Sequence, residues 1–301
     1  MIFRTSPRFD IDLIITSDWH LMEKERNPPC RLDSHWEAQW DKVDQIKTIQ
    51  MQNDCDIFNA GDIFEHYKAS PFLINQCIER FPHKMRCLIG NHDSPERNAA
   101  LIEKSAWDTL FRSDIINGFA TQGDWGTPLD KIGPIGYKNR RIVLFHDLIW
   151  KNNIPFPGCE APRVKKIFRM FKNADLIISG HNHETFYAQN KNQILINPGS
   201  LTRHKADQIN HKPCIFLYNA KNNSFKIHYL EIKNDVISRE HLEIKNRKDN
   251  EEQKFLMKLK KGWKIDLSFE KNIEIAIIKN KVPKSLQTII FKWLNKSGGI
   301  K

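Results

Sequence analysis

The chain reads Leu13-Ile14-Ile15-Thr16-Ser17-Asp18-Trp19-His20 near its start, and this stretch sets the pattern for the whole fold. Its first half is apolar and rich in β-branched residues, which is typical of a buried β-strand. Its second half brings a carboxylate and an imidazole two residues apart. In an extended backbone, residues two apart point to the same side, so we expect Asp18 and His20 to face one site while Trp19 faces away.

The same pattern recurs four more times, with polar residues of metal-ligand type directly after an apolar strand. The predicted strands and the residues that follow them are Asp56–Ala60 with Gly61-Asp62, Met85–Ile89 with Gly90-Asn91-His92-Asp93, Arg141–Phe145 with His146, and Asp175–Ser179 with Gly180-His181-Asn182-His183. In open α/β sheets, ligands bind outside the carboxyl ends of the strands. These segments are therefore predicted to converge on one site, and the glycines among them suit sharp turns close to a metal.

Seven side chains at these strand ends offer oxygen or nitrogen ligand atoms, and none offers a thiolate. They are Asp18, His20, Asp62, Asn91, His146, His181 and His183. Such a set favours hard to borderline divalent ions, and we expect Mn²⁺, with Fe²⁺ or Zn²⁺ as alternatives. Seven ligands exceed what one four-coordinate zinc site uses, but they suit two ions about 3.5–4 Å apart that share a carboxylate. The sequence therefore predicts a site for two divalent metal ions.

Strands and helices alternate through the first 231 residues, and strand-rich sequence closes this part of the chain. Further strands are expected over Gln193–Ile196, Cys214–Tyr218 and Phe225–Leu230, and helices after Ser34, after Ser70, and over 97–111 and 161–172. Ser34 and Glu37 have the spacing of a capping box, which marks the start of the first helix. This order of elements predicts an α/β fold with two sheets and with helices on the outer faces.

The composition indicates a folded protein and excludes a disordered or collagen-like chain. Hydrophobic residues make up 40% of the 301 residues and charged residues 28%. No apolar run approaches the ~18 residues of a membrane span, and no signal-peptide core develops at the start of the chain. The six cysteines are scattered, as expected of reduced thiols. We therefore expect a cytoplasmic protein with no membrane association.

The net charge of +11 favours a polyanionic partner, and it is unevenly distributed. Residues 232–301 hold 17 Lys or Arg and 9 Asp or Glu, so we expect a boundary near Asn234, with a basic, partly helical extension over 235–301. Within it, the stretch Lys245–Lys264 has the composition of a solvated linker or flexible basic strip. Apolar residues at helical spacing predict a short amphipathic helix over Pro283–Asn295, which either packs on its own domain or docks to a partner subunit.

As a set, the five motifs resemble those of the calcineurin-like metallophosphoesterase superfamily, and the resemblance spans residues 12–183. It implies a four-layer α/β/β/α sandwich with a dinuclear site. It also implies that one ion takes Asp18, His20, Asp62 and His183, and that the other takes Asp62, Asn91, His146 and His181. His92 is then expected outside both ligand sets, near the scissile phosphate, where it donates a proton or stabilises charge, with Asp93 orienting it.

The residues within the motifs are similar to those of SbcD-type nucleases. These form the meiotic-recombination-eleven family, which works beside an SbcC-type coiled-coil ATPase. The segments that carry this likeness are Ser17–Leu21, Gly61–Phe64 and Asn91–Ser94, with Asn197–Arg203 and Ala206–Pro213 resembling the compact phage versions. Glu65 stands where many members have Asp, and the short tail leaves at most a remnant of a DNA-capping domain. The likeness implies a DNA exonuclease or endonuclease of repair, recombination or replication, an ATPase partner and a homodimer.

Two other functions stay open on the sequence. A phosphatase or phosphodiesterase for small phosphoesters would use the same ligands, whereas an inactive scaffold is expected to lack a ligand, and none is missing. For the nuclease, the predicted phosphate contacts are Arg203, Lys205, Lys258, Lys260 and Lys261, although a solvated surface is the simpler interpretation of each. The other histidines, His204 among them, are expected at the surface or as hydrogen-bonded polar residues.

Overall fold

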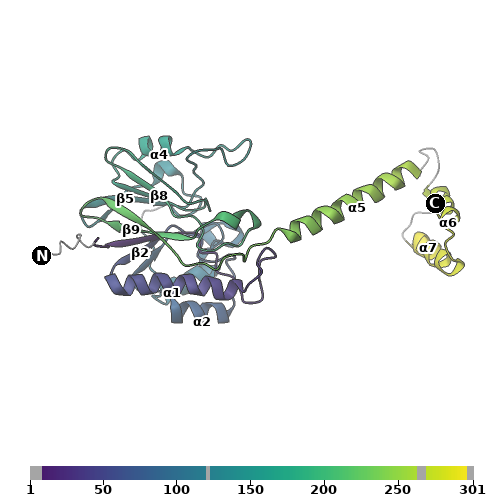
Figure 1. Cartoon of the computed structure of the whole chain (residues 1–301), viewed down its shortest axis with the longest axis horizontal. Helices are drawn as coiled ribbons and strands as arrows, with labels where there is room; N and C mark the ends of the chain where they lie inside the picture. Colours follow the sequence, from purple (N-terminus) through teal and green to yellow (C-terminus); the bar gives the residue numbers. More distant parts are fainter. Residues whose placement is uncertain (1–8, 120–122, 263–268, 297–301) are drawn as a thin grey trace, which may run out of the picture. The chain divides into compact units, whose positions relative to one another are not determined.

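The computed structural model describes residues 9–119, 123–262 and 269–296, and the chain divides into two compact units, residues 1–239 and 240–301. The first unit contains two five-stranded mixed sheets that pack face to face. Helices cover their outer faces, so the unit is a four-layer α/β/β/α sandwich (Figure 1). The fold class predicted from the sequence is confirmed.

The first sheet has the strand order β10-β9-β1-β2-β3. Its strands are β1 (Leu13–Thr16), β2 (Asp56–Asn59), β3 (Met85–Cys87), β9 (Cys214–Asn219) and β10 (Ser224–Tyr229). β1, β2 and β3 run parallel, whereas β9 and β10 continue the sheet antiparallel. In β1, Ile14 packs toward the helices while Leu13 and Ile15 pack between the sheets. Because both faces are covered, the strand is apolar throughout.

The second sheet has the order β4-β5-β6-β8-β7. Its strands are β4 (Ile135–Tyr137), β5 (Arg140–Phe145), β6 (Leu176–Ser179), β7 (Phe186–Gln189) and β8 (Ile194–Asn197). β5, β6 and β8 run parallel, and β4 and β7 flank them antiparallel at the two edges. Both sheets thus contain three parallel strands, whose carboxyl ends share one edge of each sheet.

Helices α1 (His35–Asn53), α2 (Pro71–Arg80) and α3 (Ala106–Arg112) cover the first sheet, and α4 (Val164–Met170) covers the second. The side chains of Ser34 and Ser70 accept hydrogen bonds from backbone N–H groups of the first turns of α1 and α2, which fixes where these helices begin. The short 3₁₀ helices are η1 (Pro95–Arg97), η2 (Ala99–Lys104), η3 (Leu129–Lys131) and η4 (Ala206–Asn210).

The helix predicted over 97–111 is broken into η2 and α3. Arg97 has a φ of 57°, which is incompatible with a right-handed helix. Ser105 is extended, and its hydroxyl accepts a hydrogen bond from the backbone N–H of Asp108, so that a new helix begins there. Local capping therefore divides the segment that was expected to form one continuous helix.

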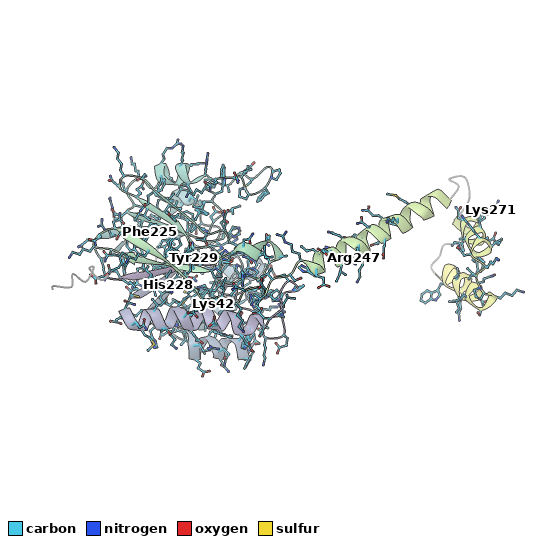
Figure 2. All side chains as sticks on the ribbon, viewed as in Figure 1. Lys42, Phe225, His228, Tyr229, Arg247 and Lys271 are labelled. Atoms are coloured by element: carbon cyan, nitrogen blue, oxygen red, sulfur yellow. The ribbon has the colours of Figure 1, made fainter. Side chains whose placement is uncertain are left out.

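The first unit continues to Arg239 because Val236 and Ile237 are buried against Cys30. The second unit contains α5 (Glu240–Gly262), α6 (Phe269–Lys279) and α7 (Lys284–Lys296); Arg247 and Lys271 are labelled in Figure 2. The basic stretch predicted as a linker or flexible strip is thus helical as far as Gly262. Across the described ranges, no helix is both long and apolar enough to cross a lipid bilayer.

Candidate metal centre

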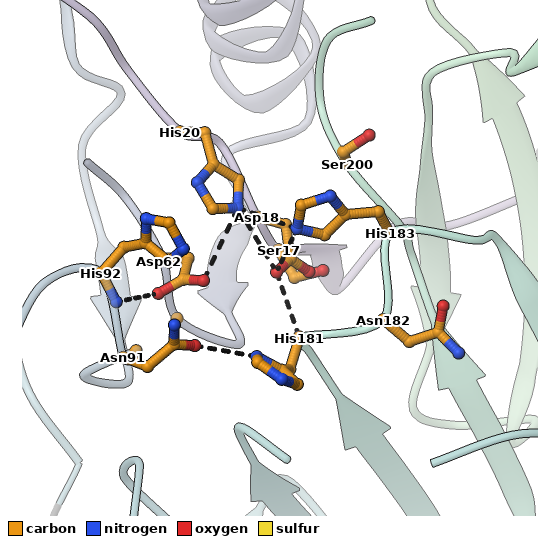
Figure 3. Close-up of polar contacts among 12 residues, drawn as sticks. Ser17, Asp18, His20, Asp62, Asn91, His92, His181, Asn182, His183 and Ser200 are labelled. Atoms are coloured by element: carbon orange, nitrogen blue, oxygen red, sulfur yellow. Dashed lines mark hydrogen bonds and ion pairs between the residues drawn. The ribbon is translucent and has the colours of Figure 1, made fainter. Parts of the chain in front are cut away.

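The predicted ligands come together where the parallel strands of both sheets end. Figure 3 shows side chains that follow β1, β2, β3 and β6 directed toward one space. His146, which follows β5, joins them, since its Nε2 lies 3.1 Å from Asn91 Oδ1. The packing of the two sheets therefore converts five separate sequence motifs into one site.

The backbone at this site differs from the extended conformation that the Asp18 and His20 spacing suggested. Asp18, His20, Asp62 and His181 have φ values of 51°, 47°, 55° and 72°, in the left-handed region that non-glycine residues rarely adopt. Asp18 and His20 still reach one site, and Trp19 is buried in the helix-facing core as expected. Such strained conformations persist where the surrounding structure fixes them, and they cluster at functional sites.

Two glycines allow the close approach that this geometry requires. Gly61 has a φ of 101°, and a Cβ added there would lie 2.4 Å from His146 Nδ1. A Cβ added at Gly90 would lie 2.0 Å from Asp62 Oδ1. Any side chain at either position would displace a predicted ligand. Only glycine therefore fits beside Asp62 and His146 at these two positions.

The first group of potential metal ligands contains Asp18, His20 and His183, whose ligand atoms all lie within 4.8 Å of one another. The Nε2 atoms of His20 and His183 face each other at 3.0 Å, and Asp18 Oδ1 lies 3.8 Å from His183 Nε2. Asp62 Oδ2 is 3.5 Å from His20 Nε2, which makes it a fourth possible ligand of this group.

The second group contains Asp62, His146 and His181, and Asn91 lies among them. Asp62 Oδ2 is 3.2 Å from His146 Nε2, and Asn91 Oδ1 is 2.8 Å from His181 Nδ1. Asp62 therefore stands between the two groups. This arrangement matches the ligand sets that the family resemblance implies, with one carboxylate placed to serve two ions.

The chemistry of the site fits divalent cations. Asp18 Oδ2 is buried without a hydrogen-bond partner among the described residues, and Asp62 Oδ2 also accepts no hydrogen bond there. A buried carboxylate oxygen is costly unless a positive charge or a donor compensates it. Imidazole nitrogens gathered around carboxylate and amide oxygens are a ligand set that Mn²⁺, Fe²⁺ and Zn²⁺ share. A pair of divalent ions would satisfy both oxygens at once.

The pKa values of the histidines show how protons compete with metal ions for this site. Burial would lower the pKa of His146, but the negative charges of Asp62 and Asp18 raise it to about 10. Burial and the neighbouring positive charge of His146 together lower the pKa of His181 to about 4. In the metal-free protein, a protonated His146 thus partly neutralises Asp62. Metal binding must displace this proton.

A family model for the calcineurin-like phosphoesterase superfamily domain matches residues 11–221, more than half of the chain. The chain belongs to the calcineurin-like phosphoesterase superfamily. Together with its histidine and aspartate clusters, this membership makes it a metal-dependent phosphoesterase. No curated protein matches the sequence.

Solved structures with the same fold include an archaeal phosphodiesterase, at 14% identity and a TM-score of 0.42, over 72% of this chain and 99% of the other. A conserved protein from Streptococcus pneumoniae, described as a predicted phosphoesterase, is 14% identical with a TM-score of 0.36, over 76% and 95% of the two chains. A metallophosphoesterase from Sphaerobacter thermophilus is 14% identical with a TM-score of 0.37, over 73% and 89%. At such identities the likeness concerns the fold.

His92 lies at the edge of this phosphoesterase site, where its side chain is 33% exposed. Its backbone N–H donates to Asp62 Oδ1 at 2.8 Å, and its Nδ1 donates to the carbonyl oxygen of Glu65 at 2.7 Å. With Nδ1 occupied, Nε2 is the atom free to exchange a proton with a substrate. His92 also forms a third potential ligand group with His20 and Asp62, so it stands within reach of the metal position as well as of solvent.

The structure places Asp93 away from the orienting role expected for it. Its carboxylate is buried and accepts hydrogen bonds from the backbone N–H groups of Gly90, Ile63 and Phe64 at 3.0, 3.3 and 3.0 Å. Burial, with the nearby charge of Asp62, raises the pKa of Asp93 to about 6. Asp93 thus ties together the loops after β2 and β3, and it is the carbonyl of Glu65 that holds the His92 ring.

Glu65 was visible in the sequence only as a departure from the family pattern. In the structure its Oε2 lies 2.7 Å from His20 Nδ1. A carboxylate at this position keeps the proton on Nδ1 and directs the Nε2 lone pair toward the metal position. The sequence contains no signal for this contact, because it depends on how the loops after β1 and β2 pair.

His204 is buried beside the site, contrary to the surface or hydrogen-bonded position expected for it. Its ring centroid lies 5.2 Å from that of His20 and 5.4 Å from that of His183, and neither ring nitrogen has a partner among the described residues. Burial lowers its pKa, so the ring is neutral. On the other side of the centre, Trp125 lies 5.0 Å from the ring of His181. Neither residue carries a motif that would have identified it.

The structure places the five predicted phosphate contacts in different environments. Arg203 is 93% buried, and its guanidinium donates to the carbonyl oxygen of Lys233, so this residue is not presented to a polyanion. Lys205 is exposed, and its charge acts on His183 and Glu65, which places it near the metal centre. Lys258, Lys260 and Lys261 lie on α5, and their side chains are outside the described part of the structure.

Proposed function

We propose that the chain is a dinuclear metal-dependent phosphodiesterase that cleaves DNA. The observation that carries the phosphodiesterase is the position of Asp62 between two ligand groups, one with His20 at 3.5 Å and the other with His146 at 3.2 Å. A phosphate held by such ions would lie near His92, whose backbone N–H donates a hydrogen bond to Asp62 Oδ1. Mn²⁺ is the ion that we propose for both positions.

The chemistry divides between the ions and the residues around them. When bound, two divalent ions lower the pKa of a water toward ~7 and neutralise the charge of the phosphate. The residues that would hold that pair line one space with their ligand atoms turned inward; they are Asp18, His20, Asp62, Asn91, His146, His181 and His183. His92 donates a proton from Nε2 to the leaving sugar oxygen, while the Glu65 carbonyl keeps Nδ1 in place.

Two observations support DNA as the substrate: the net positive charge of the chain and the likeness of its motif sequences to those of SbcD-type nucleases. The chain has 47 Lys and Arg against 36 Asp and Glu, and Lys205 lies exposed beside the metal centre. A protein that neutralises several DNA phosphates binds more weakly as salt rises, so the affinity should fall steeply with salt concentration. The likeness to SbcD-type nucleases points to the same substrate and to work in DNA repair or recombination.

A small phosphodiester is the second candidate. It is favoured by the burial of Arg203, which removes one expected DNA contact, while the metal ligands serve either substrate equally. The two candidates share the catalytic chemistry and differ only in what holds the rest of the substrate. Salt dependence therefore discriminates between them, because a small ester contacts few cations.

The second unit provides support for a partner. On α7, Leu286, Ile289 and Trp293 are 50%, 51% and 68% exposed. These residues follow one another at helical spacing and form an apolar stripe, which is how an amphipathic helix presents itself to a groove on another protein. We propose that this stripe docks to a coiled-coil ATPase of SbcC type. A homodimer of the first unit stays a family-based expectation.

Deleting residues 283–301 tests the docking role. The shortened chain should hydrolyse a small ester as the full chain does, because every proposed ligand lies in the first unit. It should no longer bind the ATPase in pull-down or calorimetry. Normal ATPase binding by the shortened chain would refute the role of α7.

The decisive experiment on function is hydrolysis of labelled linear DNA and of bis-p-nitrophenyl phosphate in excess Mn²⁺. Asp62→Asn and His92→Ala serve as controls, since each removes one part of the proposed chemistry. DNA cleavage that both substitutions abolish would support the nuclease. Turnover of the ester with DNA left intact, also in the presence of the ATPase, would favour the small-molecule phosphodiesterase.

A further inference from the structure

A second pocket lies beside the loop that carries His183. Its volume is about 420 Å³, within the ~300–1,000 Å³ of typical small-ligand sites. It opens between β7 and β10, the edge strands of the two sheets, and Tyr187 and Tyr229 line it from those strands. We call it the Tyr187/Tyr229 pocket.

The two tyrosines present aromatic surface to solvent. Tyr187 is 41% exposed and Tyr229 is 58% exposed. The Tyr187 ring packs against Phe225 in an edge-to-face contact, with 5.1 Å between ring centroids. A fixed, exposed ring is suited to stack on a planar ligand, because little conformational freedom is lost on binding.

Positive charge accompanies the rings. Lys151 Nζ lies 5.3 Å from the centre of the Tyr187 ring, and Lys212 lines the same pocket and is exposed. Glu184 is the one carboxylate among the lining residues, and burial lowers the pKa of His211, so that its ring is neutral. Two lysines against one carboxylate leave the pocket positive, which suits an anionic ligand.

The pocket is connected to the metal centre through residues that directly follow His183 and through two hydrogen bonds. Glu184 and Thr185 line the pocket and directly follow His183 in the chain. The backbone N–H of Ser200 donates to the carbonyl of His183 at 3.2 Å, and His211 Nε2 donates to the carbonyl of Ser200 at 2.7 Å. A ligand in the pocket therefore touches the same short segment that presents a proposed metal ligand.

We propose that the Tyr187/Tyr229 pocket binds one unpaired nucleotide, with its base stacked on the tyrosines and its phosphate near Lys151 and Lys212. Stacking of a base on an aromatic ring requires that the base be unpaired, so the ligand is a single strand, a frayed end or a free nucleotide. For a nucleic-acid strand this inference rests on the proposed nuclease function, and it adds that the enzyme prefers single-stranded or frayed DNA.

The strand geometry supplies a matched control. Ile227 and Tyr229 both line the pocket, as residues two apart on β10 should. His228 stands between them, is also exposed, and is not a lining residue; both side chains are labelled in Figure 2. Tyr229→Ala removes the ring from the pocket, His228→Ala changes the opposite face of the same strand, and Tyr229→Phe keeps the ring.

The test measures binding rather than catalysis. Fluorescein-labelled dT₁₂ and an abasic strand of the same length are titrated with the full chain in EDTA, and anisotropy gives the two Kd values. The wild type should bind dT₁₂ on the order of 5- to 100-fold more tightly than the abasic strand, as expected for base stacking. Tyr229→Ala should lose most of this preference, whereas His228→Ala and Tyr229→Phe should keep it.

Equal binding of the two strands by the wild type would overturn the proposal, and so would an unchanged preference in Tyr229→Ala. Competition by dTMP separates the two sources of ligand. Displacement of dT₁₂ by dTMP at concentrations near the dT₁₂ Kd would assign the pocket to free nucleotides, and weak competition would assign it to a strand. Cleavage in Mn²⁺ is measured separately, so a chain that prefers dT₁₂ but leaves DNA intact, also in the presence of the ATPase, would refute the nuclease and retain the pocket.

Discussion

Replacing Glu65 by alanine should weaken metal binding although Glu65 is not a proposed ligand. Its Oε2 lies 2.7 Å from His20 Nδ1, so its negative charge acts directly on that side of the ring. This contact keeps the proton on Nδ1 and turns the Nε2 lone pair toward the metal position. Without the carboxylate, the ring can change tautomer or rotate, and His20 becomes a poorer ligand.

The structure sets the size of the effect. Removing the partner behind a metal-ligating histidine lowers metal affinity about 10- to 100-fold, or about 1.4–2.7 kcal/mol. The Glu65 side chain is 35% exposed, so water replaces part of the lost ion pair, and the lower end of this range applies. We therefore expect about a tenfold rise in the Kd for Mn²⁺. For a unit of this size, the Mn²⁺-induced increase in Tm should shrink by about 3–6 °C.

Calorimetric titration of the metal-free protein with Mn²⁺ measures the Kd, and thermal unfolding with and without Mn²⁺ measures the gain in Tm. Glu65→Gln keeps an acceptor for Nδ1 but loses the charge, so its Kd should fall between those of the wild type and Glu65→Ala. Glu25→Ala, in an exposed loop, should behave as the wild type. If Glu65→Ala binds Mn²⁺ as tightly as Glu25→Ala does, the proposed support of His20 is refuted.

Two further changes test the metal centre, and a third tests how the stability of the fold depends on pH. His92→Ala should retain two Mn²⁺ by elemental analysis and lose at least about 100-fold in ester hydrolysis, and loss of metal would contradict its place outside the ligand sets. Gly90→Ala puts a methyl group 2.0 Å from Asp62 Oδ1 and 2.3 Å from the Asp62 backbone nitrogen, so it should displace Asp62 and abolish Mn²⁺ binding in calorimetry; normal metal content would refute the crowding. Burial lowers the pKa of His35 from 6.5 to about 4, so the unfolded chain gains a proton that the folded chain excludes. The stability from this group is complete above pH 6.5 and is lost as the pH falls toward 4, and urea unfolding of metal-free His35→Gln should show a flatter decline than the wild type.

The central strands could be predicted because their burial is complete. β1 and β6 are buried at all four positions, so an unbroken apolar run signals each of them. The edge strands β4 and β7 gave no such signal. β7 alternates only partly between buried and exposed residues, and its pairing is decided by β8, which follows it in the chain. Pairing with a neighbour, rather than local sequence, makes these two segments strands.

The helix α5 could not be predicted for the opposite reason, because its described side chains are nearly all exposed. Every one of its described side chains up to residue 254 is exposed apart from His241, so no buried stripe was present to reveal a helix. Its charge pattern resembles that of a solvated strip, because an exposed helix and a solvated coil carry similar residues. What distinguishes them is the absence of Gly and Pro before Gly262, together with Glu240 and Glu243 in the first turn, where negative charge stabilises a helix.

At the metal centre, the residues that gather at one place were predictable and their geometry was not. Asp18 and His20 face one site as their spacing suggested, yet through left-handed conformations that no pattern of residue types encodes. Glu65 and His204 reach the site because distant loops meet there. Sequence motifs therefore predict which residues can serve as metal ligands. Which residues orient those ligands depends on the packing of the fold and cannot be predicted from the motifs.

The cations show why composition identifies a partner only weakly. Arg203 has the residue type of a phosphate contact, but its burial and its hydrogen bond to a backbone carbonyl commit it to the fold. Lys151 stood in no motif, and Lys212 only in the stretch Ala206–Pro213, yet both line a pocket with exposed tyrosines beside the loop of His183. If DNA is the substrate, substitutions of Lys151 and Lys212 should reduce the salt dependence of binding, whereas Arg203→Ala should chiefly lower Tm. The opposite result would mean that the polyanion approaches from another face.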